Sequence, residues 1–564
     1  MLELQSKKLL GNIILVAVAI VTLVVAPYTL LDPINLPKLL VLVFFSIVAL
    51  SLFVTTVKSV FNSESKNLLI VLSLFVLQII LVLLFSGANF GGQLYGTFGR
   101  NTGALAYLSL AFLLLGASLV SDQEFLKKFV RMGFIVGVSL IVYGNIQFLG
   151  LEPLPFVNAY TVNAPIGTFG NSNFQSAFMG LTAVVAFTMA LNTEFKIRFR
   201  VGLALMGFAS IIVIYETLAK QGYLSFMAGA GVVVVLWLFM SKRKALGIAV
   251  AGIGLIGGGL VFLALVNIGP LANYLYKSSL AARGFYWQAG MKMVVDHPFF
   301  GVGMDGFGDW YRRTRSEEYL AKGFQSVSDT AHNVYLDIAS SGGFPLILIY
   351  CAIIVLVIIS IVRVSKRGDG IDYYFLAIVG AWVAYQAQSF VSINQLGLAI
   401  WGWVLSGLII GYEINTRVKV VDQTSPKAGK QQRKQSKVLT QPMSSATVMR
   451  VFGGVILGAI VAIPPYYVNA SFLSALKSGD IKAIQSAAYL RPIDERRLLH
   501  LATILRDNKL DAEAIVVVRD ATVGYPDSFD LWNLWASIPS ATPADVDYSK
   551  AQMKRLDPFN PDLK

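Results

Sequence analysis

Cysteine and charged side chains are both scarce in this chain of 564 residues. The single cysteine, Cys351, excludes an intrachain disulfide, and its position inside an apolar run predicts an inert, buried thiol. Charged residues make up 14% of the chain, whereas soluble domains carry about 25%. Because 55% of the residues are hydrophobic as well, the composition argues against a soluble globular protein.

Several catalytic signatures are missing from the sequence. The chain has no HExxH motif and no paired CxxC motifs, and its long polar interval over 268–343 carries no DxD-type carboxylate cluster, so a metal site has little support. It has no Walker loop of the form GxxxxGK[ST], which argues against ATP-driven transport. It also has no GxSxG elbow, which argues against a serine hydrolase of that fold. We therefore predict no metal and no cofactor.

Long apolar runs are what the chain has instead. About 20 apolar residues cross the roughly 30 Å hydrocarbon layer of a bilayer as a helix. We predict an all-α polytopic membrane protein of about 12–13 transmembrane helices. The expected spans are 10–31, 37–57, 67–86, 103–120, 129–149, 173–193, 201–218, 222–240, 245–267, 344–363, 372–392, 396–413 and 450–467.

The net charge of +14 is spread over short loops and does not form one basic face, which argues against nucleic-acid binding. Every second loop is basic, as the positive-inside rule requires for a cytoplasmic N-terminus. The first apolar run lacks a small-residue cleavage site, so we expect a retained span. The opposite short loops hold few cations, so we expect each of these to have a structural or functional role. They are Lys38, Arg100 and Lys220.

This topology divides the chain into four parts. We predict a transmembrane domain over 1–413, in which residues 268–343 form a large extracytoplasmic loop. A basic cytoplasmic linker follows over 414–449, then an additional span over 450–467. Residues 468–564 form an extracytoplasmic helical tail. Prolines in the tail recur at spacings near 34 residues, which is the tetratricopeptide period, but an ordinary small helical domain explains the pattern equally well. Such a tail could bind a protein partner.

The long loop holds the two side chains best suited to chemistry. His332 titrates near neutrality and could accept a proton from an acceptor hydroxyl; the alternative is a polar cap on the following helix. Arg283 could hold phosphate oxygens through its guanidinium; the alternative is a cation at the lipid headgroups. His297 precedes a proline and a glycine-rich turn, so we expect a structural role for it.

Two isolated cations on the outer side are further candidates. Lys220 follows a span, where a structural ion pair and a phosphate contact are both credible. Arg100 lies in the segment GGQLYGTFGRNTG, whose glycines would let the backbone approach a ligand closely. Glycine-rich turns are also common where no ligand binds.

Four motifs in the chain resemble the superfamily of O-antigen ligases and O-antigen polymerases, which also includes bacterial oligosaccharyltransferases that modify proteins. The match at 282–307 is the most specific, and the resemblance covers roughly residues 80–410. The motifs are GTFGNSNF (167–174), TLAKQG (217–222), ARGFYWQAGMKMVVDHPFFGVGMDGF (282–307) and DTAHNVYLDIASSGGFPLILIY (329–350).

The resemblance implies an inverting, metal-independent glycosyltransferase in the bacterial cytoplasmic membrane. Its donor would be a glycan on a polyprenyl diphosphate, and its acceptor a glycan, lipid or protein. The loop histidine of the family falls on His332 as candidate base, and its loop arginine on Arg283 as candidate diphosphate ligand. A second basic residue, usually arginine, falls near Lys220, where lysine keeps the charge but loses the planar fork. Arg100 could share or replace that role.

Other functions remain open at the level of sequence. A polymerase would use another lipid-linked glycan as its acceptor. A flippase or other transporter for lipid-linked oligosaccharides belongs to a different class, which favours paired inverted repeats and charges near the bilayer midplane. A non-catalytic scaffold would bind a partner through the tail, and this function would not explain Arg283 and His332 in the loop.

Overall fold

The computed structural model describes residues 2–60, 65–154, 164–265, 268–270, 272, 278–324, 326–367, 370–422 and 444–563. In these residues the chain is all-helical. Eleven of the described helices are long and apolar enough to cross a membrane. Two further helices of 17 residues each, α5 (Ala104–Val120) and α16 (Tyr373–Ser389), coincide with the two remaining predicted spans. The prediction of an all-α polytopic membrane protein is confirmed.

The membrane-length helices follow one another along most of the chain. They are α1 (Leu2–Leu23), α2 (Asn35–Val60), α3 (Lys66–Phe85), α6 (Gln123–Phe148), α7 (Ser172–Ala190), α8 (Ile197–Glu216), α9 (Gln221–Met240), α10 (Lys244–Leu265), α15 (Val334–Ser365), α17 (Leu396–Asp422) and α19 (Ser445–Ser478).

Short helices make up the parts outside the bundle. The long loop contains α12 (Ser278–Asp296), α13 (Phe307–Thr314) and α14 (Glu317–Ala321), while α4 (Phe90–Tyr95) and η1 (Gly167–Phe169) lie in two shorter connections. The tail contains α20 (Ile481–Ala488), α21 (Glu495–Asp507), α22 (Asp511–Gly524), α23 (Phe529–Ala536), α24 (Pro543–Leu556) and η2 (Pro561–Leu563).

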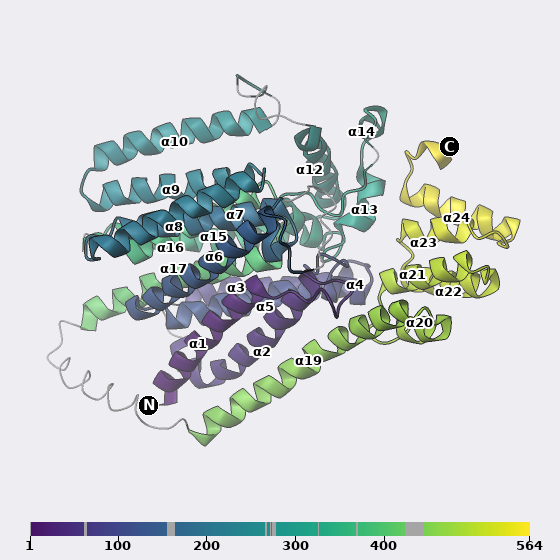
Figure 1. Cartoon of the computed structure of the whole chain (residues 1–564), viewed down its shortest axis with the longest axis horizontal. Helices are drawn as coiled ribbons and strands as arrows, with labels where there is room; N and C mark the ends of the chain where they lie inside the picture. The colour runs from purple at the N-terminus through teal and green to yellow at the C-terminus, as the bar shows by residue number, and fades with distance from the viewer. Residues whose placement is uncertain are drawn as a thin grey trace.

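The arrangement of these parts is visible in Figure 1. The bundle occupies one side, the tail helices α20–α24 the other, and α12–α14 stand between them. The N-terminus lies at the end of the bundle away from the tail. Helix α19 packs along α2 and continues out of the bundle into the tail, where α20 follows it. Of the predicted linker over 414–449, residues 423–443 lie outside the described part of the chain.

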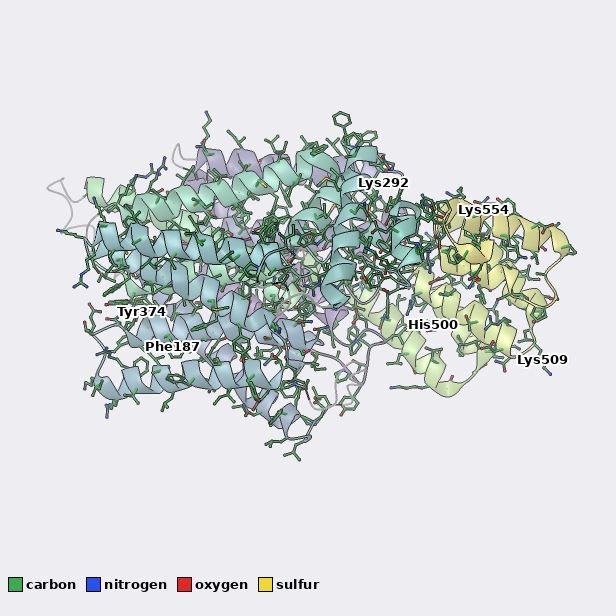
Figure 2. The ribbon with its side chains drawn as sticks, turned by 90° about the horizontal axis from the view of Figure 1, so that it is seen from above. Phe187, Lys292, Tyr374, His500, Lys509 and Lys554 are labelled. Carbon is green, nitrogen blue, oxygen red and sulfur yellow. The ribbon has the colours of Figure 1, made fainter. Side chains whose placement is uncertain are left out.

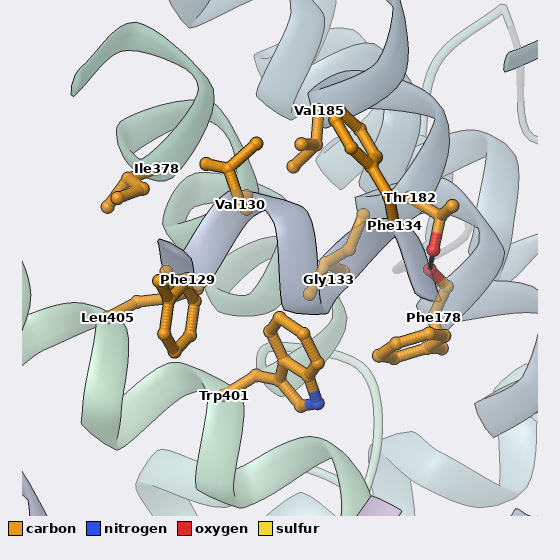
Figure 3. A pocket seen from close by; sticks show the side chains of 12 residues that line it. Phe129, Val130, Gly133, Phe134, Phe178, Thr182, Val185, Ile378, Trp401 and Leu405 are labelled. Atoms are coloured by element: carbon orange, nitrogen blue, oxygen red, sulfur yellow. Dashed lines mark hydrogen bonds between the residues drawn. The ribbon is translucent and has the colours of Figure 1, made fainter. Parts of the chain in front are cut away.

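Helix α17 lies at the centre of the bundle and is almost entirely buried, whereas α10 is apolar all round and almost entirely exposed. Because an apolar helix surface needs an apolar neighbour, the exposed surface of α10 is suited to lipid. A hollow of about 30 Å³ lies beside Trp401 of α17, Phe129 of α6 and Phe178 of α7. Figure 3 shows the side chains that line it. Its lining is almost wholly apolar, so this hollow is a packing gap without chemistry.

The prediction that Cys351 is a buried core residue is wrong. Its side chain is exposed on α15 and lines a groove against α3 together with Asn67 and Val71. An apolar run in a membrane helix does not distinguish the face that meets protein from the face that meets lipid, because both favour apolar side chains.

Helix α15 bends sharply at Gly343, whose φ is +71°. The bend receives the segment that follows α12: Phe344 N donates to Pro298 O at 2.8 Å, and Val302 N donates to Ser340 O at 2.8 Å. A Cβ on Gly343 would collide with the Pro298 carbonyl, and one on Gly301 with the Ser340 carbonyl. The two motifs at 282–307 and 329–350 therefore need glycine where their backbones touch.

Lys38, a cation in a loop predicted to lie on the outer side, has a structural role. Its side chain is fully buried and Nζ donates to the carbonyls of Val21, Thr22 and Val24 at 2.9–3.0 Å. These carbonyls end α1, where backbone acceptors lack helical partners and the helix dipole is negative. Lys38 is therefore a cap on α1.

Candidate active site

His332 lies on the short connection into α15, directly before the capping residue Asn333, whose side chain accepts from Leu336 N at 3.1 Å. The backbone of His332 is left-handed, with φ of +53°. Non-glycine residues are uncommon in this region, although asparagine, aspartate and histidine are enriched there, and backbone strain of this kind gathers at functional sites. The imidazole is half-buried, and its ring centre lies 5.6 Å from that of Tyr286.

A buried carboxylate maintains this conformation. Asp337 accepts from Thr330 Oγ1 at 2.6 Å and from Ala331 N at 2.7 Å. The backbone N–H of His332 in turn donates to Thr330 Oγ1 at 3.1 Å. Asp337 lies one helical turn inside α15, so the helix carries the connection before it as a rigid unit.

Arg283 lies on α12, one turn before Tyr286. Its Nη1 donates to the carbonyl of Val391 at 2.8 Å, which ties α12 to the turn after α16. Burial lowers the pKa of Arg283, against a smaller opposing effect of Tyr286. A guanidinium nevertheless stays protonated under all ordinary conditions. One of its five N–H donors is used in the bond to Val391.

The electrostatics of His332 connect it to Arg283. Burial and, next in size, the positive charge of Arg283 lower the pKa of His332 to about 4, with a smaller contribution from Arg100. His332 is therefore neutral near pH 7, the form that accepts a proton. Because both Arg283 and His332 lie next to Tyr286, the structure brings together two of the four predicted site residues.

Arg100 is held in a network of its own. Its Nη2 lies 2.9 Å from Asp305 Oδ1, and Nη1 lies 3.6 Å from Asp329 Oδ1 and donates to the Asp329 carbonyl. The guanidinium is largely buried. Asp329 is three residues before His332. Arg100 therefore fixes the start of the connection that carries His332, and Asp337 fixes its end at α15. A diphosphate contact by Arg100 would have to compete with these two carboxylates.

The glycine-rich segment around Arg100 encloses Asp305. The carboxylate of Asp305 accepts from Thr97 N at 2.8 Å and from Thr102 Oγ1 at 2.9 Å. A Cβ on Gly96, whose φ is +85°, would lie 2.6 Å from Asp305 Oδ2. We predicted that the glycines of this segment let its backbone approach a ligand closely. In the structure the backbone approaches the Asp305 carboxylate of the same chain. Sequence reasoning missed Asp305, although its place between two glycines in the most polar interval was a usable signal.

Lys220 lies at the N-terminus of α9 with its side chain exposed. Its neighbour Gln221 donates to Gln388 Oε1 at 2.9 Å, and Gln388 lies at the end of α16, close in sequence to the carbonyl of Val391 that binds Arg283. The segment that carries Lys220 and the one that carries Arg283 thus meet the same turn. Within the described residues, no three His, Cys, Asp or Glu side chains gather as a candidate metal site.

The other singled-out groups have structural partners. His297 packs edge-on against Trp310, with ring centres 4.4 Å apart. In the GTFGNSNF segment, Gly167 N donates to Gln147 Oε1 at 2.8 Å and Thr168 Oγ1 to the Thr22 carbonyl at 2.7 Å. His500 lies in the tail, as Figure 2 shows, 6.3 Å from the ring of Phe472.

The fold and this site define a multi-pass membrane protein whose polar groups gather at one end of the bundle. Residues 205–351 match the family model described as O-antigen ligase. This match supports a place in the O-antigen ligase superfamily, whose general activity is glycosyl transfer of the ligase or polymerase type. The matched segment includes Lys220, Arg283 and His332, while Arg100 lies outside it. A comparison with curated proteins finds none that matches the chain.

Proposed function

We propose that the protein transfers a glycan from a polyprenyl diphosphate carrier to an acceptor hydroxyl on a glycan, lipid or protein. The reaction takes place at the outer face of the bacterial cytoplasmic membrane, with the N-terminus in the cytoplasm and the tail outside. The observation that carries the proposal is the convergence of a neutral imidazole, His332, and a partly buried guanidinium, Arg283, around Tyr286.

His332 acts as the general base. It accepts the proton of the acceptor hydroxyl while that oxygen attacks the anomeric carbon from the side opposite the phosphate. A new carbon–oxygen bond forms as the bond to the carrier's phosphate oxygen breaks, and the anomeric configuration inverts. The bonding electrons leave with the lipid diphosphate, which needs no added proton because it is weakly basic. The chemistry requires no metal ion.

Arg283 binds the diphosphate and offsets the negative charge that develops on it. A fixed cation in a partly buried site stabilises such charge more than water does, since it needs no reorientation. A guanidinium also suits two phosphate oxygens at once. Lys220, on the segment that meets the same turn, is the candidate second cation, and Arg100 supports the His332 connection and is a weaker candidate for the same role.

The test uses the purified full-length protein, a polyprenyl-diphosphate glycan and a measurement of released lipid diphosphate. His332→Ala should reduce release by roughly 100-fold or more, the range typical of a lost general base. His297→Ala is the matched control in the same loop and should keep release within a few-fold of the wild type. Release by His332→Ala close to the wild-type rate would overturn the proposal.

The same assay separates the alternatives. Mass spectrometry of the products distinguishes a ligated acceptor from a lengthened carrier-linked glycan, which would indicate a polymerase. Movement of the intact donor across a vesicle membrane that persists in His332→Ala, without bond cleavage, would indicate a flippase.

A further inference from the structure

A cavity of about 550 Å³ lies between the long loop and the tail. Its walls come from the segment around Phe98, the start of α13, residues 327–329, and the tail helices α21 and α23. The volume falls in the range of roughly 300–1,000 Å³ that is typical of small-molecule sites. Asp329 lines it, so the cavity reaches the connection that carries His332.

Ion pairs fix the tail against the loop and therefore fix the cavity walls. Arg315 pairs with Asp557 through two guanidinium nitrogens, with Nε 3.2 Å from Oδ1, and both side chains are almost fully buried. Arg313 pairs with Asp527 at one rim of the cavity. In Figure 1, α13 of the loop and α24 of the tail face each other, and the two helices are in contact.

The cavity contains polar groups that have no use within the chain. Asn101 is only 6% exposed, and nothing among the described residues donates to its Oδ1. Asp309, at the start of α13, lines the cavity and makes no hydrogen bond or ion pair with any described residue. Its side chain is exposed on the side that faces the cavity. A buried acceptor such as the Asn101 oxygen costs roughly 1–3 kcal/mol of folding free energy when it lacks a donor, and a bound ligand that donates to it would recover that cost.

The charge of the lining restricts the ligand. Eight carboxylate side chains and three arginines line the cavity. Burial raises the pKa of Asp309 to about 8, with Glu495 and Asp527 adding to the rise, and burial raises that of Glu495 to about 7. With eight carboxylates against three arginines, the lining carries more acidic than basic groups. An anionic ligand would therefore be disfavoured, whereas hydroxyl and ammonium groups would supply the missing donors.

We propose that this cavity is the acceptor site and that it takes an uncharged, hydroxyl-rich glycan. Asn101, Asp309 and Glu495 accept hydrogen bonds from sugar hydroxyls, and the rings of Tyr95 and Tyr525 offer apolar faces to the sugar C–H groups. The glycan extends past Asp329 so that its reacting hydroxyl meets His332. This assignment rests on the proposed function, and it makes the tail part of the substrate site.

The test measures binding and needs no turnover. In full-length protein with Cys351→Ser, Val327→Cys places one thiol in the cavity wall, and its rate of maleimide labelling is followed. The uncharged trisaccharide of N-acetylglucosamine should slow labelling at least 3-fold. The trisaccharide of galacturonate should not. Labelling of Val523→Cys, exposed on the tail and outside the cavity lining, should respond to neither probe.

Two substitutions sharpen this experiment. Asn101→Gly, which keeps the left-handed backbone at φ of +56°, and Asp309→Asn should each raise the half-protecting trisaccharide concentration by roughly 3- to 10-fold, the loss expected of one hydrogen bond. Asp547→Asn, exposed on α24 outside the cavity lining, is the matched control and should not.

Each result has a definite meaning. Equal labelling of Val327→Cys with and without the uncharged trisaccharide overturns the proposal, as does equal protection by galacturonate. Protection by a serine-rich peptide in place of the glycan overturns it in favour of a protein acceptor. Because labelling requires no catalysis, an active His332→Ala variant would refute the proposed function and leave the outcome for the cavity unchanged.

Discussion

The Arg100 guanidinium and the Asp305 carboxylate form a buried ion pair, 2.9 Å apart, between two glycine-rich segments that are about 200 residues apart in the sequence. Asp305 also accepts from Thr97 and Thr102, and Arg100 also binds Asp329. This pair therefore joins the loop that precedes α5 to the connection that carries His332. Its loss should affect stability and catalysis together.

Asp305→Asn should lower the free energy of unfolding by about 3 kcal/mol, because removing one partner leaves a buried charge without compensation. Thermal unfolding of the purified protein in detergent measures the change. The matched control is Glu318→Gln, which breaks an exposed pair with Lys322 at 2.7 Å. Such exposed pairs contribute about 0–1 kcal/mol. Equal effects of the two substitutions would show that the Arg100–Asp305 pair is not structural.

Asp337→Asn should reduce kcat by roughly 10-fold and leave the KM for the donor unchanged. The substitution weakens the acceptor for Thr330 Oγ1 and Ala331 N, so His332 loses its fixed position while Arg283 is untouched. Asp337 is a positioning residue, and steady-state kinetics with the lipid-linked donor separate the two constants. Ser340→Ala, whose hydroxyl bonds within the same helix, is the control. A rise in KM alone would contradict a positioning role.

Arg283→Lys should lower turnover by roughly 10-fold or more, although the charge is kept. Lysine loses the planar fork, and hydrogen bonds to charged groups contribute about 1.5–3 kcal/mol each. Lys292→Arg tests the reverse exchange at an exposed position on the same helix, labelled in Figure 2, and should have no effect. Single-turnover release of lipid diphosphate measures both. Near-normal release by Arg283→Lys would remove Arg283 from the diphosphate site.

The pH dependence of kcat/KM should follow His332. Burial and the charge of Arg283 lower its pKa to about 4, so the free base persists down to about that pH and activity falls only below it. Replacing Arg283 with glutamine removes one positive charge, so the acidic limb should move toward the ordinary histidine value near 6.5. Arg100 lowers the pKa as well and Asp329 raises it, and both stay in place. An acidic limb that does not move would show that Arg283 and His332 are electrostatically independent.

Asp557→Asn should loosen the tail from the loop. The side chain of Asp557 is fully buried between Arg315 and Arg312, so its loss leaves one buried and one partly buried cation less compensated. Hydrogen exchange of α13 should accelerate. Asp530→Asn removes an exposed partner of Arg312 at 3.7 Å and should leave exchange nearly unchanged. Unaltered exchange in Asp557→Asn would mean that the tail docks by other contacts.

Much of the fold could be predicted because a bilayer requires long apolar helices, and each of the thirteen predicted spans falls on a helix. His332 and Arg283 could be chosen because polar side chains are few on the predicted outer side. Asp337 and Asp305 could not, since their importance comes from contacts made across a turn or across about 200 residues. The sequence shows Arg312, Arg313 and Arg315 only as a charged run, and their partners lie on the tail.

The pairing of Arg315 with Asp557 spans 242 positions of the chain. A ribosome that has just released the long loop must still make α15, α16, α17 and α19 and the tail helices α20–α24 before Asp557 emerges. Until then Arg315 lacks its partner Asp557, and the cavity between the long loop and the tail lacks the wall that the tail helices supply. The cavity between the long loop and the tail therefore has all of its walls only after the tail helices have been made.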